Sequence, residues 1–350
     1  MSGERARSRR GWNVRTIRTS TILLLLLWWA ALVPPPAVAL GPEQLGLIVN
    51  IADPYSVEIG AHHARLRGIP PANVVFVTLP AGRDEISREE FETAKAEADA
   101  RLPVTVQALA LAWTTPFRVD CLSITTAFAF GFDPAFCAQG CRPTRRSPYF
   151  NSPSRAPFSD LALRPAMLLA GQSVAEGKAL IDRGVAADAT FPDGTAYLLS
   201  TSDRARNTRA AGYALLDAMK PRVRVERLET DELRDRRDVL FYFTGLQTVA
   251  GLETLRFRPG AIADHLTSTG GELTGHAQMS VLRWLEAGAT ASYGTVAEPC
   301  NFTAKFPQPA LAIARYTRGE TVLEAYWKSV AMPGQGVFVG EPLAAPFRAR

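Results

Sequence analysis

Apolar runs alternate with helical patterns along the first third of the chain after residue 41. The apolar runs have the length of buried strands, and the stretches between them place apolar residues at helical spacing. The order is strand 46–50, helix 56–66, strand 73–77, helix 87–101 and strand 106–113. Strands that alternate with helices in this way predict a parallel sheet covered by helices on both faces.

Residues 118–165 break this pattern, because they contain many prolines and serines and three of the four cysteines. We expect an irregular, cystine-pinned insertion over one edge of the sheet. The alternation then returns, with strands at 166–170, 196–200, 223–228, 239–243, 289–293 and 337–339 and helices at 173–185, 204–219, 277–287, 309–317 and 321–330. A further strand is expected to end at Thr267–Gly271. The predicted fold is α/β with a mostly parallel, doubly wound, flavodoxin-like sheet. It forms one domain over residues 40–350, or two halves at 40–117 and 166–350.

The N-terminal segment has the features of an export signal. A basic stretch precedes the apolar core at residues 22–33, and Ala37-Val38-Ala39 is a small-x-small cleavage site. We expect a signal peptide over residues 1–39, and the alternative is an uncleaved anchor that reaches the membrane through this segment. Ser8-Arg9-Arg10 partly resembles a twin-arginine signal, whereas the leucine run also suits general secretion. The expected location is periplasmic or secreted.

The formal net charge of +5 comes from this leader. Residues 1–39 hold six arginines and one acid, Glu4, so the rest of the chain carries 33 basic and 33 acidic residues. A balanced chain of this kind lacks the positive footprint of a nucleic-acid-binding protein. We therefore expect no nucleic-acid partner. The expected partner is an unidentified ligand or a component of the cell envelope.

The cysteines are Cys121, Cys137, Cys141 and Cys300. In an exported protein we expect disulfides, but four cysteines allow three pairings that sequence cannot separate. One of the possible pairings joins Cys300 to Cys121. No histidine lies between residues 64 and 264, so a metal site near Cys137 has little support. Phosphate-loop, dinucleotide and zinc-hydrolase motifs are missing from the sequence, and we expect no cofactor and no metal.

Small polar and charged residues follow several of the predicted strands. Parallel α/β sheets bind ligands outside the carboxyl ends of their strands, so these residues are candidates for a ligand cleft. They are also the residue types that cap helices and form turns, which is the alternative interpretation. The candidate cleft residues are Asn50, Asp53, Thr114, Arg118, Thr244, Gly270 and Glu298.

Two nucleophile arrangements deserve a test. In the first, Cys300 is a thiolate and His265 or His276 is its base. In the second, Ser268 is the nucleophile and uses the same histidines. The candidate catalytic residues are therefore Cys300, His265 and Ser268.

Several segments together are similar to an uncharacterised family of exported bacterial proteins. They are Asn50–Ser56 with Arg67-Gly68-Ile69-Pro70, Tyr149–Arg155, Gly288–Val296 with Glu298-Pro299-Cys300, and Gly340–Phe347. The resemblance spans the mature chain. It implies an identity but no reaction, since members of that family are of unknown function.

The last third also resembles the caspase-like fold of gingipain-type cysteine peptidases. In those, one strand ends in Gly-His-Gly and the next strand delivers a cysteine. In this chain the place of the histidine motif is taken by Thr244-Gly245-Leu246. The place of the cysteine is taken by Thr267-Ser268-Thr269-Gly270. The resemblance therefore implies a caspase-like scaffold without the usual dyad. We expect a protein that binds a ligand or partner at the strand ends, and the alternative is a peptidase-like hydrolase that uses Cys300 and His265.

Overall fold

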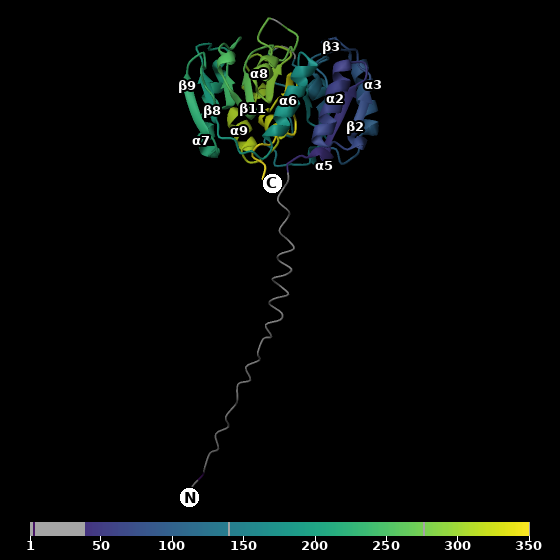
Figure 1. The fold of residues 1–350 in the computed structure, drawn as a ribbon, viewed down its shortest axis with the longest axis horizontal. Helices are drawn as coiled ribbons and strands as arrows, with labels where there is room; N and C mark the ends of the chain where they lie inside the picture. The colour runs from purple at the N-terminus through teal and green to yellow at the C-terminus, as the bar shows by residue number, and fades with distance from the viewer. Residues whose placement is uncertain (1–2, 4–38, 139–140, 276, 350) are drawn as a thin grey trace. The chain divides into compact units, whose positions relative to one another are not determined.

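The computed structural model describes residue 3 and residues 39–138, 141–275 and 277–349. Residues 39–350 group into one compact unit. The predicted leader lies outside the described residues up to Val38, as does His276. Figure 1 shows the central sheet, with β9 at one lateral end and β2 at the other.

The central sheet has ten strands in the order β2-β1-β4-β7-β13-β12-β11-β10-β8-β9. Their bounds are β1 Leu45–Asn50, β2 Val74–Val77, β4 Ala108–Leu111, β7 Ala166–Leu168, β8 Thr195–Ser200, β9 Arg224–Glu229, β10 Val239–Thr244, β11 Phe257–His265, β12 Ala291–Thr295 and β13 Gly336–Gly340. Strands β2, β1, β4 and β7 pair in parallel, and so do β12, β11, β10, β8 and β9. Strand β13 joins the two groups and runs antiparallel to β12. The predicted α/β class and mostly parallel sheet are confirmed.

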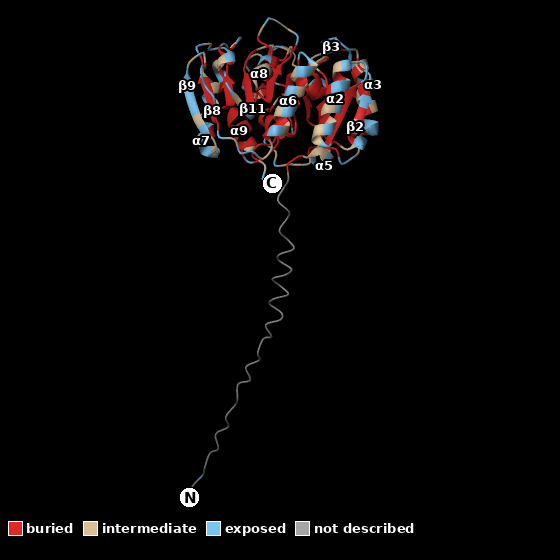
Figure 2. Cartoon of the chain, viewed as in Figure 1, coloured by how far each residue is buried: buried red, intermediate tan, exposed pale blue. Residues whose placement is uncertain are grey.

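Helices cover both faces of the sheet. Their bounds are α2 Pro54–Arg67, α3 Arg88–Arg101, α4 Ile124–Phe130, α5 Pro157–Leu161, α6 Val174–Ala187, α7 Leu215–Met219, α8 Leu282–Ala287, α9 Pro309–Tyr316 and α10 Val322–Ser329. Alternate strand residues enter two apolar cores, one shared with α3, α4 and α8 and the other with α2, α7, α9 and α10. Figure 2 shows the inner strands buried, the edge strand β9 largely exposed, and the outer faces of α2 and α3 partly exposed. Burial on both faces explains why the inner strands read as continuous apolar runs, whereas the edge strand β9 carries charged residues.

The insertion is more regular than its sequence suggests. Within residues 118–165 lie α4, α5 and two short strands, β5 Arg118–Val119 and β6 Leu122–Ser123, which form a small sheet with β3 Glu85–Ile86. Two disulfides join Cys121 to Cys137 and Cys141 to Cys300. The insertion is therefore pinned by cystines as expected, although the Cys121–Cys300 pairing was wrong.

Two predicted helices are shorter in the structure. The expected helix at 204–219 is a 3-10 helix, η4 Asn207–Gly212, followed by α7. The expected helix at 277–287 begins only at Leu282. Both differences occur in segments that follow strands at the edge where the candidate site lies.

Candidate functional site

A cavity of about 480 Å³ lies where the direction of winding in the sheet reverses. From β1 the chain proceeds to β2 on one side and later to β4 and β7 on the other. Such a switch point leaves a crevice at the carboxyl ends of the strands, and ligands bind there in open α/β sheets. Asp53 follows β1, Thr114 and Thr115 follow β4, and Gly171 follows β7, and all four line the cavity. We call this space the switch-point cavity.

Asp53 is positioned by the start of a helix. It is the N-cap of α2, and its Oδ1 accepts a hydrogen bond from the Tyr55 backbone N–H at 3.0 Å. Burial raises the pKa of Asp53, although the backbone N–H groups of Tyr55 and Ser56 oppose the shift. Asp53 forms no ion pair with any described residue. A half-buried carboxylate without a cationic partner attracts a cation from solution.

The floor of the switch-point cavity is a hydrogen-bonded set of polar groups. The Tyr55 hydroxyl donates to the Leu169 carbonyl oxygen at 3.0 Å. Thr114 Oγ1 donates to the Gly171 carbonyl oxygen at 2.7 Å and accepts from the Gly171 N–H at 3.0 Å. Burial, helped by the nearby Asp53 and Glu176 carboxylates, raises the pKa of Tyr55, so its hydroxyl stays protonated. These bonds fix the relative positions of three strand ends before any ligand arrives.

The opposite wall comes from the second group of strands. Leu273 and Thr274 follow β11, and Leu282 begins α8. Gln172, on the β7 side, donates from Nε2 to Glu286 Oε1 at 2.6 Å. Thr274 Oγ1 donates to Asp84 Oδ1 at 2.7 Å. The carboxyl ends of both strand groups therefore meet at one edge of the sheet.

The charge of the switch-point cavity is negative. Asp53 is the one charged side chain among the described residues that line it, and the others are hydroxyl, amide, glycine or leucine side chains. A site of this composition repels phosphate and carboxylate ligands, which need basic partners. It suits an amine, with hydroxyl groups next to the threonines and Gln172.

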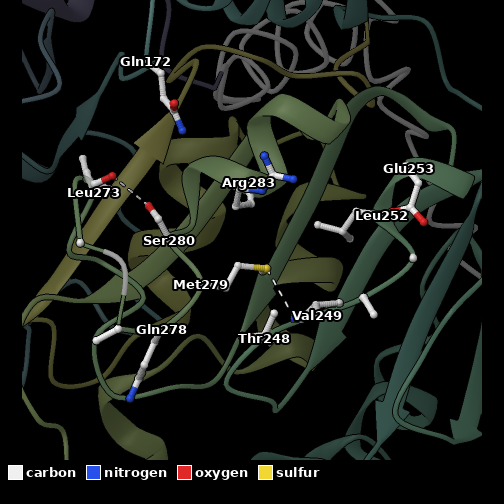
Figure 3. A pocket seen from close by; sticks show the side chains of 14 residues that line it. Gln172, Thr248, Val249, Leu252, Glu253, Leu273, Gln278, Met279, Ser280 and Arg283 are labelled. Carbon is white, nitrogen blue, oxygen red and sulfur yellow. Dashed lines mark hydrogen bonds between the residues drawn. The ribbon is translucent and has the colours of Figure 1, made fainter.

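A second cavity, of about 390 Å³, adjoins the first, and the two share Gln172 and Leu273. Figure 3 shows its lining, with Met279 between the segment at 248–253 and α8. The Val249 N–H donates to the Met279 sulfur at 3.5 Å, and Ser280 Oγ donates to the Leu273 carbonyl oxygen at 3.2 Å. Its exposed charged groups, Glu253 and Arg283, have opposite signs. This cavity therefore lacks the single-sign character of the switch-point cavity.

The structure brings Asp53 and Thr114 together in one cavity and gives Asn50 another role. Asn50 is fully buried, and its Oδ1 accepts from the Leu79 N–H at 3.0 Å and the Ala52 N–H at 3.2 Å. Its Nδ2 donates to the Leu79 carbonyl oxygen at 3.1 Å. Asn50 therefore ties the end of β1 to the loop after β2.

The other four predicted cleft residues do not line the switch-point cavity. Arg118 pairs with Glu85. Thr244 is fully buried, and Gly270 is buried where its carbonyl oxygen accepts from the Val281 N–H at 2.8 Å. Glu298 is exposed and accepts from the Cys300 N–H at 2.7 Å. Arg118 and Thr244 belong to strands β5 and β10, whereas Gly270 and Glu298 lie in loops.

Sequence reasoning missed most of the wall of the switch-point cavity. Tyr55 stands two residues after Asp53, in the first turn of α2, so the helix start could have drawn attention to it. Gly171 and Gln172 follow a strand that was predicted, and the rule about carboxyl ends applies to them equally. Leu273 and Leu282 carried no signal, because they come from the distant half of the chain.

The proposed thiolate is not available in this structure. Cys300 is bonded to Cys141, and no described cysteine is free. A disulfide sulfur is not a nucleophile, so the arrangement with Cys300 as thiolate is corrected.

His265 is buried with both ring nitrogens engaged. Nδ1 accepts from Trp284 Nε1 at 2.9 Å, so Nε2 carries the proton and donates to the Met279 carbonyl oxygen at 3.1 Å. Burial, together with the Arg209 guanidinium, lowers the pKa of His265 to about 3. A neutral imidazole with no free nitrogen cannot accept a proton from Ser268 or Cys300. His265 is therefore blocked as the base in both nucleophile arrangements, and the alternative base in each, His276, lies outside the described residues.

Close backbone packing fills the ends of β10 and β11. A Cβ at Gly245, after β10, would lie 2.0 Å from the Arg206 carbonyl oxygen. A Cβ at Gly271, after β11, would lie 2.6 Å from the Gly294 carbonyl oxygen. The Ser268 carbonyl oxygen, in the same loop, accepts from Thr295 Oγ1 at 2.8 Å. At Gly245 and Gly271 the chain is therefore packed against itself, and the residues of these two loops that line the adjoining cavity stand farther along the chain.

No protein-family model, curated protein or solved structure matches this chain. In the part of the chain that the structure describes, no helix combines the length and apolar character needed to cross a bilayer. Function must therefore be argued from the geometry of the site itself.

Proposed function

We propose that this chain is an exported α/β protein that binds a small amine-bearing ligand in the switch-point cavity. One observation carries the proposal. Asp53, half-buried and without an ion-pair partner among the described residues, lines a cavity of about 480 Å³ at the strand ends. Cavities of several hundred Å³ with a few fixed polar groups are typical of small-molecule sites.

The chemistry of the lining selects the ligand class. An ammonium group would pair with the Asp53 carboxylate. Ligand hydroxyl groups would donate to Thr114 Oγ1, whose own proton is used in the bond to Gly171, and would exchange hydrogen bonds with Thr115 and Gln172. Leu273 and Leu282 would cover an apolar face of the ligand. An anionic ligand would meet the carboxylate without a basic residue to compensate, so it should be rejected.

Export rests on two independent features. The first is the leader, with its apolar core and Ala37-Val38-Ala39. The second is the pair of disulfides, which persist in oxidising compartments. A periplasmic or secreted binding protein is consistent with both. The caspase-like scaffold is part of the proposal, supported by the adjacent parallel strands β10 and β11 on which such a fold would place its dyad.

The test uses two probe sets that vary charge on a constant frame. The first set is glucosamine, glucose and glucose 6-phosphate, and the second is cadaverine, pentane-1,5-diol and glutarate. Thermal unfolding of the mature protein is followed with each probe, because a ligand that binds the native state raises Tm. We expect the cation to raise Tm in at least one set, and the anion to leave it unchanged. A preference for the anions, or no response in either set, would contradict the proposal.

Asp53→Asn is the matched variant. Asparagine is as good an N-cap as aspartate, so α2 keeps its start and only the charge is lost. Glu58→Gln is the control, since it makes the same change of charge at an exposed position of α2 that pairs with Lys178. We expect Asp53→Asn to weaken amine binding at least tenfold, about 1.4 kcal/mol, while Glu58→Gln leaves it unchanged.

A further inference from the structure

The predicted cleavage site lies inside the folded edge of the domain. Ala39 is 3% exposed and Leu40 is 1% exposed. The Leu40 N–H donates to Glu324 Oε2 at 3.3 Å, and the Leu40 carbonyl oxygen accepts from Arg348. The nitrogen that cleavage after Ala39 would release is therefore held by a buried carboxylate.

Hydrogen bonds at the start of helix α10 hold the Glu324 side chain in position. Glu324 is the third residue of α10 and forms a capping box with Thr321, whose N–H donates to Glu324 Oε2 at 2.9 Å and whose Oγ1 donates to it at 3.0 Å. The Glu324 side chain is fully buried, and its other oxygen, Oε1, has no hydrogen-bond partner among the described residues. A buried carboxylate oxygen left in this state is costly and gains from one more donor.

The surrounding charges belong to one cluster. Glu320 and Glu324 face Arg155, with N–O distances of 3.7 and 3.9 Å, and Lys328, with distances of 3.2 and 3.9 Å. Arg315 pairs with Glu320 at 3.1 Å. Both Arg155 and Lys328 thus lie closer to Glu320 than to Glu324. The two cations nearest Glu324 stand 3.9 Å from its Oε1, so no described cation lies within hydrogen-bond distance of this carboxylate.

We propose that hydrolysis of the Ala39–Leu40 peptide bond creates an α-ammonium group on Leu40 that pairs with Glu324 and locks the processed N-terminus into the fold. A signal peptidase adds one water molecule across the Ala39–Leu40 bond as the C–N bond breaks. The water oxygen becomes the second oxygen of the Ala39 carboxylate, and the two water hydrogens, exchanged through solvent, complete the Leu40 ammonium group. A neutral N–H donor is thereby replaced by a charge-assisted one with three protons. The proposal rests on the export part of the proposed function and not on the ligand.

The burial of Leu40 also indicates the order of leader cleavage and folding. A peptidase needs an extended, accessible segment around the scissile bond, and here both the N–H and the carbonyl group of Leu40 are bonded within the fold. Cleavage therefore precedes closure of this edge. That order fits export of an unfolded chain by general secretion better than twin-arginine export of a folded one.

The test begins with the full chain, exported and purified in its processed form. Intact mass and N-terminal sequencing should show a chain that begins at Leu40. Acetylation of its α-amine at pH 7, followed by mass spectrometry, should then be at least tenfold slower than in Glu324→Gln. Glutamine also serves in a capping box, so this variant keeps α10 and loses only the charge. Glu320→Gln, which removes a carboxylate from the same cluster without touching Leu40, should acetylate like the wild type.

A second comparison does not depend on labelling. A chain processed to begin at Ala39 again has a neutral amide at Leu40, so it should melt about 2 °C below the chain that begins at Leu40. Glu324→Gln should abolish this difference in Tm. The four proteins form a double-mutant cycle, which isolates the interaction between the Leu40 ammonium group and the Glu324 carboxylate. The proposal is overturned by a mature terminus elsewhere, by equal acetylation in Glu324→Gln, or by equal Tm values of the two forms. Since no ligand enters the assay, its failure would leave amine binding by the switch-point cavity untouched.

Discussion

Replacing His265 by glutamine should remove a large part of the acid sensitivity of this protein. In the folded chain His265 is buried and its pKa is lowered to about 3, chiefly by burial and then by Arg209. In the unfolded chain the pKa of histidine is about 6.5. Between these values the unfolded state binds more protons, so the free energy of unfolding falls as the pH falls from about 6.5 towards 3. The stability contributed by neutral His265 is fully present above pH 6.5.

The magnitude follows from the two pKa values. Each pH unit within this window costs about 1.4 kcal/mol, and the loss between pH 7 and pH 5 sums to about 2 kcal/mol. The neighbouring Asp264 acts with the opposite sign, because burial raises its pKa to about 6 and its folded form gains protons as the pH falls. The wild-type curve alone therefore mixes two effects. The difference between the wild type and His265→Gln isolates the histidine.

Glutamine is the appropriate replacement at this position. Its carbonyl can accept from Trp284 Nε1 and its amide can donate to the Met279 carbonyl oxygen, as the imidazole does. Denaturant unfolding of both proteins at pH 7, 6 and 5 gives the free energies. We expect the wild type to lose about 2 kcal/mol more than the variant between pH 7 and pH 5. Equal losses would show that His265 can be protonated in the fold, and the argument against it as a blocked base would fail.

Three further predictions concern packing and covalent structure. Gly245→Ala should cost about 2–3 kcal/mol, since the new Cβ meets a backbone oxygen at 2.0 Å. Gly212→Ala, with no atom within 4 Å of its Cβ, should be nearly neutral in the same thermal unfolding assay. The Cys141→Ser/Cys300→Ser double variant should lose about 2–4 kcal/mol, because the bond closes a loop between residues 159 positions apart. The single Cys141→Ser variant, which frees the Cys300 thiol, should show no hydrolysis of a peptide library, and activity there would restore the hydrolase hypothesis.

The order of strands and helices was readable from the sequence because the sheet is covered on both faces. Each strand of the first group, such as β1 or β4, is an apolar run bounded by turn residues, and each predicted run contains a strand of the structure. The order of strands within the sheet was not readable in detail. Strand β13 lies between the two groups, and its place depends on contacts with β12 and β7 far away in sequence.

The shortened helix at 277–287 shows why local periodicity was insufficient. The Met279 N–H donates to the Gln247 carbonyl oxygen at 3.1 Å, and the Val281 N–H donates to the Gly270 carbonyl oxygen at 2.8 Å. These tertiary partners satisfy backbone groups that a helix would otherwise satisfy. The segment therefore runs irregularly across the sheet edge, and its residues Ala277, Gln278, Met279 and Ser280 line the adjoining cavity.

The helix expected at 204–219 is interrupted for a related reason. Asn207 Oδ1 accepts from the Thr201 N–H at 3.0 Å, and Asn207 Nδ2 donates to Ser200 Oγ at 3.0 Å. Arg206, just before it, lies against Gly245 across the end of β10. The side chain of Asn207 thus ties the start of this segment back to β8, and a 3-10 helix forms there.

Two residues of the candidate site were predictable, and most of its wall was not. Asp53 and Thr114 follow strands β1 and β4, so the rule that ligands bind at strand ends found them. The same rule also selected Thr244 and Glu298, and nothing local distinguishes an open strand end from a closed one. The difference lies in the tertiary packing of the loops, such as Arg206 on Gly245.

The most direct test of the ligand site is a crystal structure of the mature protein grown with glucosamine and, in parallel, with cadaverine. The account predicts that at least one of these amines lies in the switch-point cavity, with its ammonium group within about 3 Å of the Asp53 carboxylate. The same crystals of Asp53→Asn should show the cavity without the amine. An amine bound instead in the adjoining cavity beside Arg283, or bound equally in Asp53→Asn, would contradict the assignment of the site.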